Sequence, residues 1–311
     1  MDKAAKILIV GRGLSALGLK EGLKARGYRY VFWSETMGMD PGVQAAVLAF
    51  FQAERPDYVF LTSVRSGGIQ ANIDAPAEFM YQNLVAQDHV IHAAWMFGVK
   101  KLLFVSGSCV YPARCPQPMS EEAVLSAPME GTSEPYSLAK VAGMKLAQAF
   151  HRQYGFNAIS VVPATIYGPG DPGDLEKAHV MGALIHRFTR AVREQAEEVE
   201  VWGSGEARRE FLFVEDFVEG CLFLMRRYDQ EGWINMGVGA DIAIGDLARI
   251  IAEATGFKGR IVFNTKRPDG VRQKLLDSRR IRQLGWRPRV ELKEGIRQTV
   301  EWFTRKERSS I

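Results

Sequence analysis

The hydrophobic residues in the first half of the chain form short continuous runs, and segments of helical period separate these runs. The runs occupy residues 7–10, 58–61, 102–105 and 158–162. Strands that are apolar on both faces and alternate with helices are typical of a parallel sheet covered by helices on both sides. The pattern therefore predicts an α/β domain built on a doubly wound parallel sheet.

The chain changes character after residue 166. Residues 167–173 are rich in glycine and proline, and such stretches mark turns and loops. Residues 213–225 have the period of a helix, and residues 233–236 have the composition of a strand that can rejoin the sheet. We therefore expect a first domain made of residues 1–166, with residues from about 211 to 237 returning to it. Residues 167–210 and 238–311 are expected to form a smaller C-terminal α/β lobe.

Composition adds limits to this picture. The 311 residues, 47% of them hydrophobic, suffice for a large domain with an additional lobe. The net charge of +4 comes from scattered Lys and Arg, without the basic run of a nucleic-acid-binding protein. The apolar N-terminal stretch is too short for a membrane span and too strand-like for a signal peptide, so we expect a cytoplasmic protein. Cys109, Cys115 and Cys221 lack metal-ligand spacing and cannot all pair, so we expect reduced thiols and no metal site.

A glycine-rich turn follows the first predicted strand. Gly11, Arg12, Gly13, Leu14, Ser15 and Ala16 match the pattern G-x-G-x-x-G/A between a strand and a helix. In that context small residues let the backbone approach a pyrophosphate, and the free N–H groups at the start of the helix attract the anion. The alternative is an ordinary turn between a strand and a helix. The position at the start of a βαβ pattern favours a site for a dinucleotide.

The residues that would select between NAD and NADP point in opposite directions. Glu35, after the second predicted strand, has the spacing of an acidic residue that bonds the adenine ribose of NAD. Arg12, inside the turn, can instead contact the 2′-phosphate of NADP. Either side chain can also be merely solvated. These residues therefore do not decide between NAD and NADP.

A tyrosine and a lysine stand four residues apart at the start of a helical segment. Tyr136 and Lys140 therefore lie on one face of that helix and can share a site. A nearby ammonium favours the phenolate, so we expect the pKa of the tyrosine to be lowered. Such a pair is a proton relay for hydride chemistry on a ketone or a sugar hydroxyl. A pair of this kind also occurs by chance on solvated helix faces, but here it accompanies the glycine-rich turn.

Taken together, these residues resemble the extended short-chain dehydrogenases/reductases, specifically the branch that acts on GDP-linked 4-keto-6-deoxy sugars. The resemblance covers nearly the whole chain. It implies a dinucleotide-binding Rossmann domain, a smaller substrate-binding lobe and a homodimer, often built through a four-helix bundle. It is carried by residues 67–72, 81–83, 108–112, 134–140, 201–205, 209–212 and 274–277.

The resemblance also implies roles for individual residues. Tyr136 matches the general acid of a C4 ketone reduction, and Lys140 matches its helper, which also holds the nicotinamide ribose. Cys109 and His179 match the base and the acid of a 3,5-epimerisation, since a ketone acidifies the neighbouring C–H bonds. Without the resemblance, these two residues would be a core thiol and a loop residue. Cofactor-binding positions matched in this way are Gly11, Arg12, Gly13, Leu14, Ser34, Glu35, Lys140, Pro163 and His179. Positions that match contacts to the GDP moiety are Val180, Arg187, Trp202 and Arg209.

Three departures from the family pattern limit this transfer. The turn is one residue short between Gly11 and Gly13, and Ser34 and Glu35 replace a basic residue. The resemblance implies NADP(H), but a carboxylate repels a 2′-phosphate, so NAD(H) is also possible. Gly107 replaces the hydroxyl residue that accompanies the tyrosine and lysine, and Thr165 replaces an asparagine near the sugar. We expect Ser108 to substitute for the missing hydroxyl. Other candidates for that hydroxyl are Ser106, Thr132 and Ser133.

Three functions are consistent with these residues. The first is an epimerase/reductase for a GDP-sugar, which Cys109, His179, Tyr136 and Lys140 support. The second is a redox-neutral epimerase or dehydratase that holds NAD and recycles its hydride, which Glu35 and the altered turn support. The third is a non-catalytic protein that binds a nucleotide-sugar, which Gly107 motivates. The identity of the sugar depends on loop geometry that a sequence does not fix.

Overall fold

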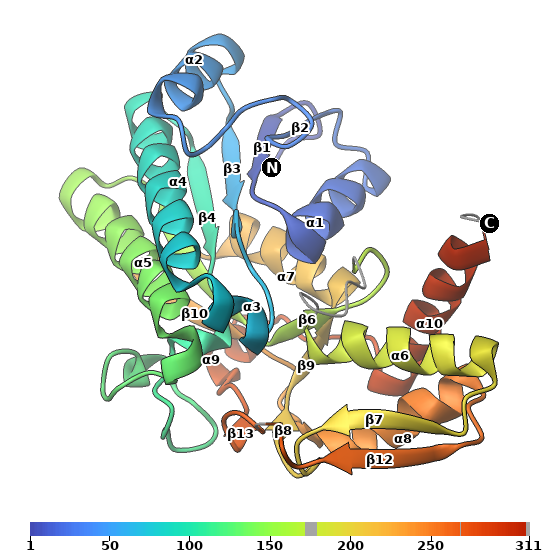
Figure 1. Ribbon diagram of the computed structural model, residues 1–311. Coiled ribbons are helices and arrows are strands. Elements are labelled where there is room, and N and C mark those ends of the chain that lie inside the picture. The colour runs from blue at the N-terminus through green and yellow to red at the C-terminus, as the bar shows by residue number, and fades with distance from the viewer. Residues whose placement is uncertain (172–178, 268, 309–311) are drawn as a thin grey trace.

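The computed structural model describes residues 1–171, 179–267 and 269–308, and its centre is a parallel sheet (Figure 1). Pro172 and Gly173, part of the predicted break in the chain, lie outside these residues. Within the described residues, six parallel strands follow the order β10-β5-β4-β3-β1-β2. Their bounds are Lys6–Val10 (β1), Tyr30–Trp33 (β2), Tyr58–Leu61 (β3), Lys101–Val105 (β4), Ala158–Pro163 (β5) and Trp233–Met236 (β10).

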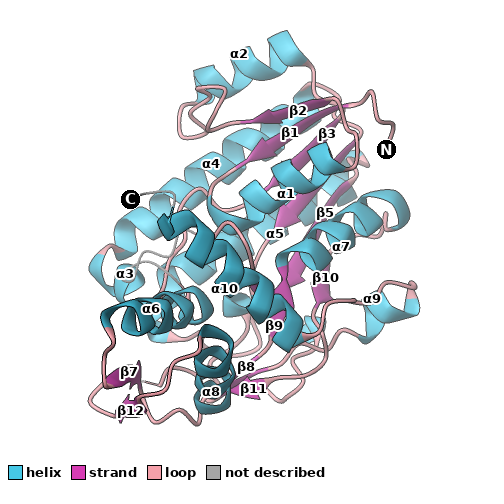
Figure 2. Ribbon diagram, turned by 90° about the vertical axis from the view of Figure 1, so that its right-hand side faces the viewer, coloured by secondary structure: helices cyan, strands magenta, loops and turns pink. Residues whose placement is uncertain are grey.

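Helices cover both faces of this sheet, as Figure 2 shows. Helices α1 (Gly13–Ala25) and α7 (Val214–Arg227) pack together on one face. On the other face lie α2 (Gln44–Glu54), α4 (Pro76–Met96) and α5 (Glu134–Tyr154). The predicted doubly wound α/β fold is therefore confirmed. The predicted helix at 213–225 and strand at 233–236 are α7 and β10.

The strand order reverses beside β1. The chain moves from β1 outward to β2 and then crosses back to β3 on the other side. Val10 pairs with Leu61 in the register of β1 and β3, so the turns that follow these strands are neighbours. In open α/β sheets, ligands bind at the carboxyl ends of the strands at such a reversal. The glycine-rich turn lies at this point.

A second lobe packs around its own hydrophobic cluster. It contains α6 (Val180–Glu194), α8 (Ile244–Thr255), α10 (Leu292–Arg308) and the strand pair β7 (Glu198–Trp202) with β12 (Arg260–Asn264). A small sheet has the order β11-β8-β13, with bounds Ile242–Ala243, Arg208–Arg209 and Gln273–Lys274. The parallel pair β6 (Thr165–Tyr167) and β9 (Phe211–Phe213) joins this lobe to the first domain.

The segment after β13 crosses back to the first domain. Three side chains of this segment pack in the hydrophobic core of the first domain: Leu276, Ile281 of α9 (Arg279–Gln283) and Trp286. They lie in the range 238–311 that we expected in the second lobe. The buried carboxylate of Glu210 fixes this crossing, because it accepts backbone N–H bonds from Gly239 at 2.6 Å and Leu276 at 2.9 Å. The two lobes are thus interleaved along the chain.

In the part of the chain that the structure describes, no helix combines the length and the apolar character that crossing a membrane requires.

Candidate active site

The glycine-rich turn has the backbone conformation that its glycines permit. Gly11 has φ +116°, and a Cβ there would lie 2.1 Å from Thr62 Oγ1, so only glycine fits this close approach. Gly13 has φ +76° and opens α1, while the preceding Arg12 makes no side-chain cap. The first N–H groups of α1 are therefore not capped by the side chain at its start. Such a helix start fits a pyrophosphate group.

Arg12 and Glu35 meet beside this turn. Arg12 Nε lies 3.6 Å from a Glu35 carboxylate oxygen, with 69% and 40% of the two side chains exposed. A pair this exposed contributes little to stability, so each partner is free to turn toward a ligand. The Ser34 hydroxyl instead accepts the Gly11 N–H at 3.3 Å and is buried. Among the remaining matched cofactor positions, Leu14 is in the first turn of α1, and Pro163 ends β5 at the same edge of the sheet.

The tyrosine and lysine lie on α5 as predicted. Glu134 and Pro135 start the helix, and Tyr136 follows in its first turn. The Tyr136 hydroxyl lies 2.8 Å from Ser63 Oγ, and its ring contacts the edge of Phe79, with ring centroids 6.0 Å apart. The tyrosine is therefore positioned from β3 and from α4.

The expected direction of the Tyr136 pKa is wrong. Burial raises this pKa above its ordinary value, and Cys109 adds to the rise, while the hydrogen bond with Ser63 lowers it. Lys140 has 1% of its surface exposed, and burial lowers the pKa of its ammonium to about 7. A lysine that is only partly charged near neutral pH does not promote the phenolate. In this state Tyr136 keeps its proton, as a general acid must.

The Lys140 ammonium has no carboxylate partner among the described residues. Its Nζ lies 4.1 Å from the centre of the Phe104 ring, and the structure gives it no hydrogen bond to a described residue. A buried ammonium costs free energy unless a partner compensates it. This buried donor, one helical turn after Tyr136 on α5, fits the ribose hydroxyls of a nicotinamide cofactor.

We predict that Lys140→Met stabilises the cofactor-free protein at pH 6 by an amount on the order of a few kcal/mol. Below about pH 7 the native state holds a buried ammonium that the unfolded state solvates, so the penalty is fully present there. It shrinks as pH rises from 7 toward the ordinary lysine pKa of 10.5 and is absent above that value. Urea unfolding at pH 6 and pH 9.5 measures the difference in the free energy of unfolding between the variant and the wild type at each pH.

Lys145→Met, at an exposed position of the same helix, is the matched control and should change stability little at either pH. If Lys140→Met were destabilised equally at both pH values, the lowered pKa of Lys140 in the native state would be contradicted.

Cys109 and His179 face a shared electrostatic environment. Cys109 is half-buried in the turn Ser108–Val110, and His179 is the exposed residue that precedes α6. Desolvation by the surrounding protein lowers the pKa of the His179 imidazole, and the ammonium of Lys274 lowers it further. The carboxylate of Asp171 acts in the opposite direction and raises it. Lys274 also interacts with Cys109, and its own pKa is lowered by burial. Sequence reasoning quoted Lys274 only as part of a motif and missed this central position.

The hydroxyls that we expected to replace the one missing at Gly107 are placed differently. Ser106 Oγ is buried and has no hydrogen-bond partner in the part of the chain that the structure describes. Thr132 and Ser133 both donate to the Glu130 carboxylate, at 2.5 and 3.2 Å. Ser108 makes no hydrogen bond to Tyr136. Within the described residues, the hydroxyl that does contact Tyr136 belongs to Ser63, which sequence reasoning missed because it lies 73 residues away in the chain.

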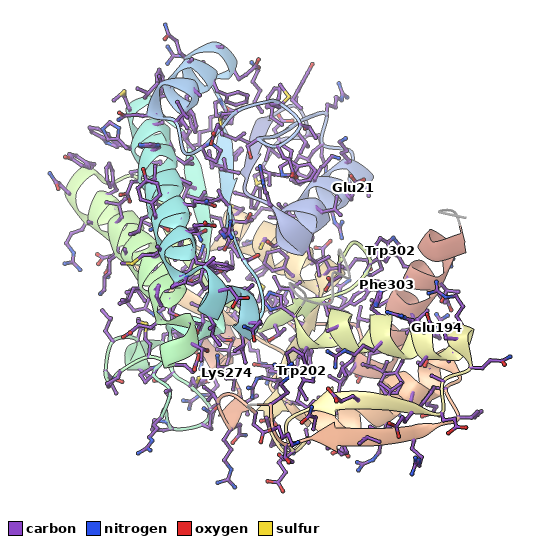
Figure 3. All side chains as sticks on the ribbon, in the orientation of Figure 1. Glu21, Glu194, Trp202, Lys274, Trp302 and Phe303 are labelled. Carbon is purple, nitrogen blue, oxygen red and sulfur yellow. The ribbon has the colours of Figure 1, made fainter. Side chains whose placement is uncertain are left out.

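The positions matched to the GDP moiety gather in the second lobe. The Arg187 guanidinium stacks on the Trp202 ring at 5.0 Å and donates to the Glu200 carbonyl at 3.0 Å. Arg267, which sequence reasoning missed, stacks on the same ring at 4.7 Å. Burial lowers the pKa of Arg187. Figure 3 shows Trp202 and Lys274 on the side of the second lobe that faces the first domain.

Arg209 and Val180 complete this set. Arg209 pairs with Lys274 in the register of β8 and β13 and donates to the Asp269 carbonyl at 3.4 Å. The Asp269 carboxylate accepts the Ser204 N–H at 2.7 Å, just after Trp202. Val180 is the first residue of α6 and follows His179 directly. An indole face with several guanidinium groups suits a purine base and a diphosphate.

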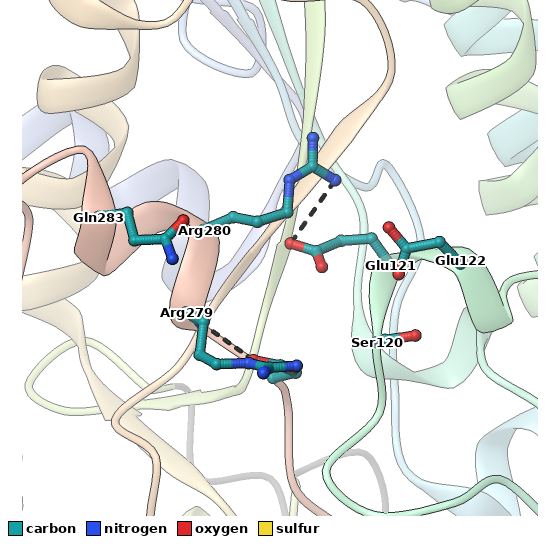
Figure 4. A pocket seen from close by; sticks show the side chains of 7 residues that line it. Ser120, Glu121, Glu122, Arg279, Arg280 and Gln283 are labelled. Carbon is teal, nitrogen blue, oxygen red and sulfur yellow. Dashed lines mark hydrogen bonds and ion pairs between the residues drawn. The ribbon is translucent and has the colours of Figure 1, made fainter.

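A small pocket elsewhere has a structural role. Its volume is about 200 Å³ and it is shown in Figure 4. Its charges pair with each other, Arg279 with Asp277 at 2.5 Å and Arg280 with Glu121 at 4.0 Å. None of the candidate catalytic residues lines it. The ion pair between Arg280 and Glu121 links α9 to the loop around Glu121. A search of the described residues also finds no cluster of His, Cys, Asp or Glu that could hold a metal ion.

Comparison with known proteins identifies the class. The pattern of the NAD dependent epimerase/dehydratase family matches residues 7–237. The chain belongs to this family, whose members are extended short-chain dehydrogenases/reductases and enzymes that depend on a nicotinamide cofactor.

Individual relatives narrow the comparison. The chain is 43% identical to the GDP-L-fucose synthase 1 of Arabidopsis thaliana, over 97% of this chain and 94% of that one. Among solved structures it is similar to a GDP-6-OMe-4-keto-L-xylo-heptose reductase from C. jejuni, with a TM-score of 0.93, 31% identity and coverage of 98% and 99%. It is also similar to the GDP-mannoheptose C4 reductase MlghC from Campylobacter jejuni with NADP bound, with a TM-score of 0.89, 32% identity and the same coverage.

Proposed function

We propose that this protein epimerises a GDP-linked 4-keto-6-deoxy sugar at C3 and C5 and then reduces its C4 ketone with NADPH. The observation that carries the proposal is that Cys109 interacts electrostatically with both Tyr136 and Lys140, while Tyr136 contacts Ser63, whose carbonyl accepts the N–H of Arg12 in the glycine-rich turn. The similarity to a GDP-L-fucose synthase and to two GDP-sugar reductases supports it.

Epimerisation needs a base and an acid on opposite faces of the sugar. In the proposed mechanism the Cys109 thiolate removes the proton from the carbon beside the ketone, because the carbonyl stabilises the resulting carbanion. His179 returns a proton to the other face. Cys109 belongs to the first domain and His179 to the start of α6, so the sugar would lie between the two lobes.

Reduction needs a hydride and a proton. The bound nicotinamide supplies the hydride, and the residues around Lys140 and the glycine-rich turn fit that cofactor. Tyr136 donates its proton to the C4 oxygen, which its raised pKa allows because the phenol stays protonated near neutral pH. Lys140 binds the ribose and moves toward the charged form as that partner compensates its burial. Arg187 and Trp202 hold the nucleotide.

We propose NADP(H) rather than NAD(H), with Arg12 as the residue that binds the 2′-phosphate. Arg12→Ala is expected to raise the KM for NADPH about 10- to 100-fold, because a charge-assisted hydrogen bond is lost, and to leave the KM for NADH nearly unchanged. Glu35→Ala, which removes a repelling carboxylate on the other side of the ion pair, should lower the KM for NADPH. Equal changes for both cofactors in steady-state kinetics of Arg12→Ala would rule out this role.

We also propose a homodimer formed through α4 and α5. These helices pack side by side along one outer face of the molecule (Figure 1). They carry a contacting aromatic group, Trp95, Phe150 and Tyr154, with Trp95 and Tyr154 ring centres 4.5 Å apart, and Tyr154 is 48% exposed. Light scattering should give about twice the 34.7 kDa of one chain. The three free cysteines fit a cytoplasmic location.

The decisive experiment incubates the purified protein with GDP-4-keto-6-deoxymannose and NADPH or NADH. Loss of the 340 nm absorbance with one cofactor, and a 3,5-inverted, 4-reduced product by NMR, is the expected result. No oxidation, with NAD released on heat denaturation, would instead support the redox-neutral function. Binding of the GDP-sugar without any turnover would support the non-catalytic alternative.

A further inference from the structure

We propose that Ser63 is a positioning residue of the proton relay, whose hydroxyl hydrogen-bonds Tyr136 and stabilises the phenolate that remains after proton transfer. The proposal rests on the function proposed above. Ser63 is the second residue after β3, whereas Tyr136 lies at the start of α5. The fold thus brings a hydroxyl from a different strand to the tyrosine.

The backbone fixes Ser63 in this position. Its carbonyl accepts the Arg12 N–H at 2.9 Å, and the preceding Thr62 donates its N–H to the Val10 carbonyl at 2.8 Å. The Thr62 hydroxyl also donates to that carbonyl, at 3.0 Å. Ser63 is therefore tied to the turn that follows β1 as well as to its own strand.

The direction of the hydrogen bond follows from the chemistry. When Tyr136 donates its proton to the ketone, its oxygen can accept a hydrogen bond only from another donor. Ser63 Oγ, at 2.8 Å, is that donor among the described residues. As the phenolate forms, the bond becomes charge-assisted and stronger. Ser63 therefore contributes more to the transition state than to the ground state.

Among the described residues near the tyrosine, no other hydroxyl is arranged to do this. The hydroxyls of Thr132 and Ser133 are engaged by Glu130. Ser137 is next to Tyr136 on α5, but its hydroxyl is buried and has no partner in the described part of the chain. Gly107 at the end of β4 has no side chain. The relay of this protein is thus assembled from β3 and α5.

The test compares Ser63→Ala, Ser63→Thr and the matched control Ser137→Ala. Ser63→Ala should lower kcat about 10- to 100-fold with little change in the KM for the sugar, because a hydrogen bond to a charged group is lost. It should also move the alkaline limb of the kcat profile to higher pH, since the bond with Ser63 lowers the pKa of Tyr136. Ser63→Thr, which keeps the hydroxyl, should restore most of kcat. Ser137→Ala should leave kcat and the pH profile unchanged.

A second measurement does not depend on turnover. In protein labelled with ¹³C at Tyr Cζ, the Tyr136 resonance, assigned with Tyr136→Phe, should shift in Ser63→Ala and stay in place in Ser137→Ala. An unshifted resonance in Ser63→Ala would overturn the proposal whether or not the wild-type protein turns over the sugar. Loss of kcat without a pH-profile change or rescue by Ser63→Thr would also overturn it, because such a loss is structural. Absence of turnover in the wild type, with the resonance shifted, would contradict only the proposed function.

Discussion

Tyr136→Phe should slow the reduction of the C4 ketone about 100- to 10,000-fold, because the group that donates the proton is removed. The phenyl ring keeps the contact with Phe79, so the fold and the affinity for NADPH should be preserved. Oxidation of NADPH in the presence of the keto sugar measures the loss, and fluorescence titration measures cofactor binding. Solvent exchange at C3 and C5 should persist, since Cys109 and His179 are intact.

Tyr30→Phe, an exposed tyrosine on the edge strand β2, is the matched control and should retain full activity. Full activity of Tyr136→Phe would eliminate the tyrosine as the general acid. Loss of both reduction and exchange in Tyr136→Phe would indicate a general disturbance of the site.

Cys109→Ala and His179→Asn should each abolish solvent deuterium incorporation at C3 and C5, with losses of about 100-fold or more. Each variant removes one of the two groups that move a proton. The pKa of His179 is lowered from its ordinary value of 6.5, so the imidazolium that returns the proton is depleted already at pH values below that one. Wild-type exchange should therefore decrease as pH rises through the mildly acidic range. NMR of the sugar in deuterated water measures all three rates.

Cys115→Ala controls for the loss of a half-buried thiol outside the site and should exchange normally. Unchanged exchange in both Cys109→Ala and His179→Asn would remove the epimerase assignment and leave a simple reductase.

The alternation of apolar runs and helical segments is enough to predict the central sheet and its two covered faces. It works because strands buried on both sides must be almost entirely apolar. The i,i+4 spacing of Tyr136 and Lys140 likewise predicts a shared face, since helix geometry fixes it locally. Features set by one element alone are therefore accessible from the sequence.

Features set by contacts between distant elements are not accessible in this way. The pKa of Tyr136 follows mainly from its burial, and Cys109, which comes from another element, adds to the rise. The contact of Ser63 with Tyr136 depends on the register of β3 against β1. The second guanidinium on Trp202, from Arg267, depends on the pairing of β7 with β12. A single sequence gives no direct signal of these pairings.

The return of β10 to the first sheet has a consequence for synthesis on the ribosome. More than 70 residues separate the end of β5 at Pro163 from the end of β10 at Met236. At a translation rate of about 5 to 20 residues per second, β5 is an unpaired edge for roughly 4 to 15 s. Such an edge can recruit a strand from a neighbouring nascent chain. The interleaved order of this fold therefore leaves the edge of β5 open until β10 has been synthesised.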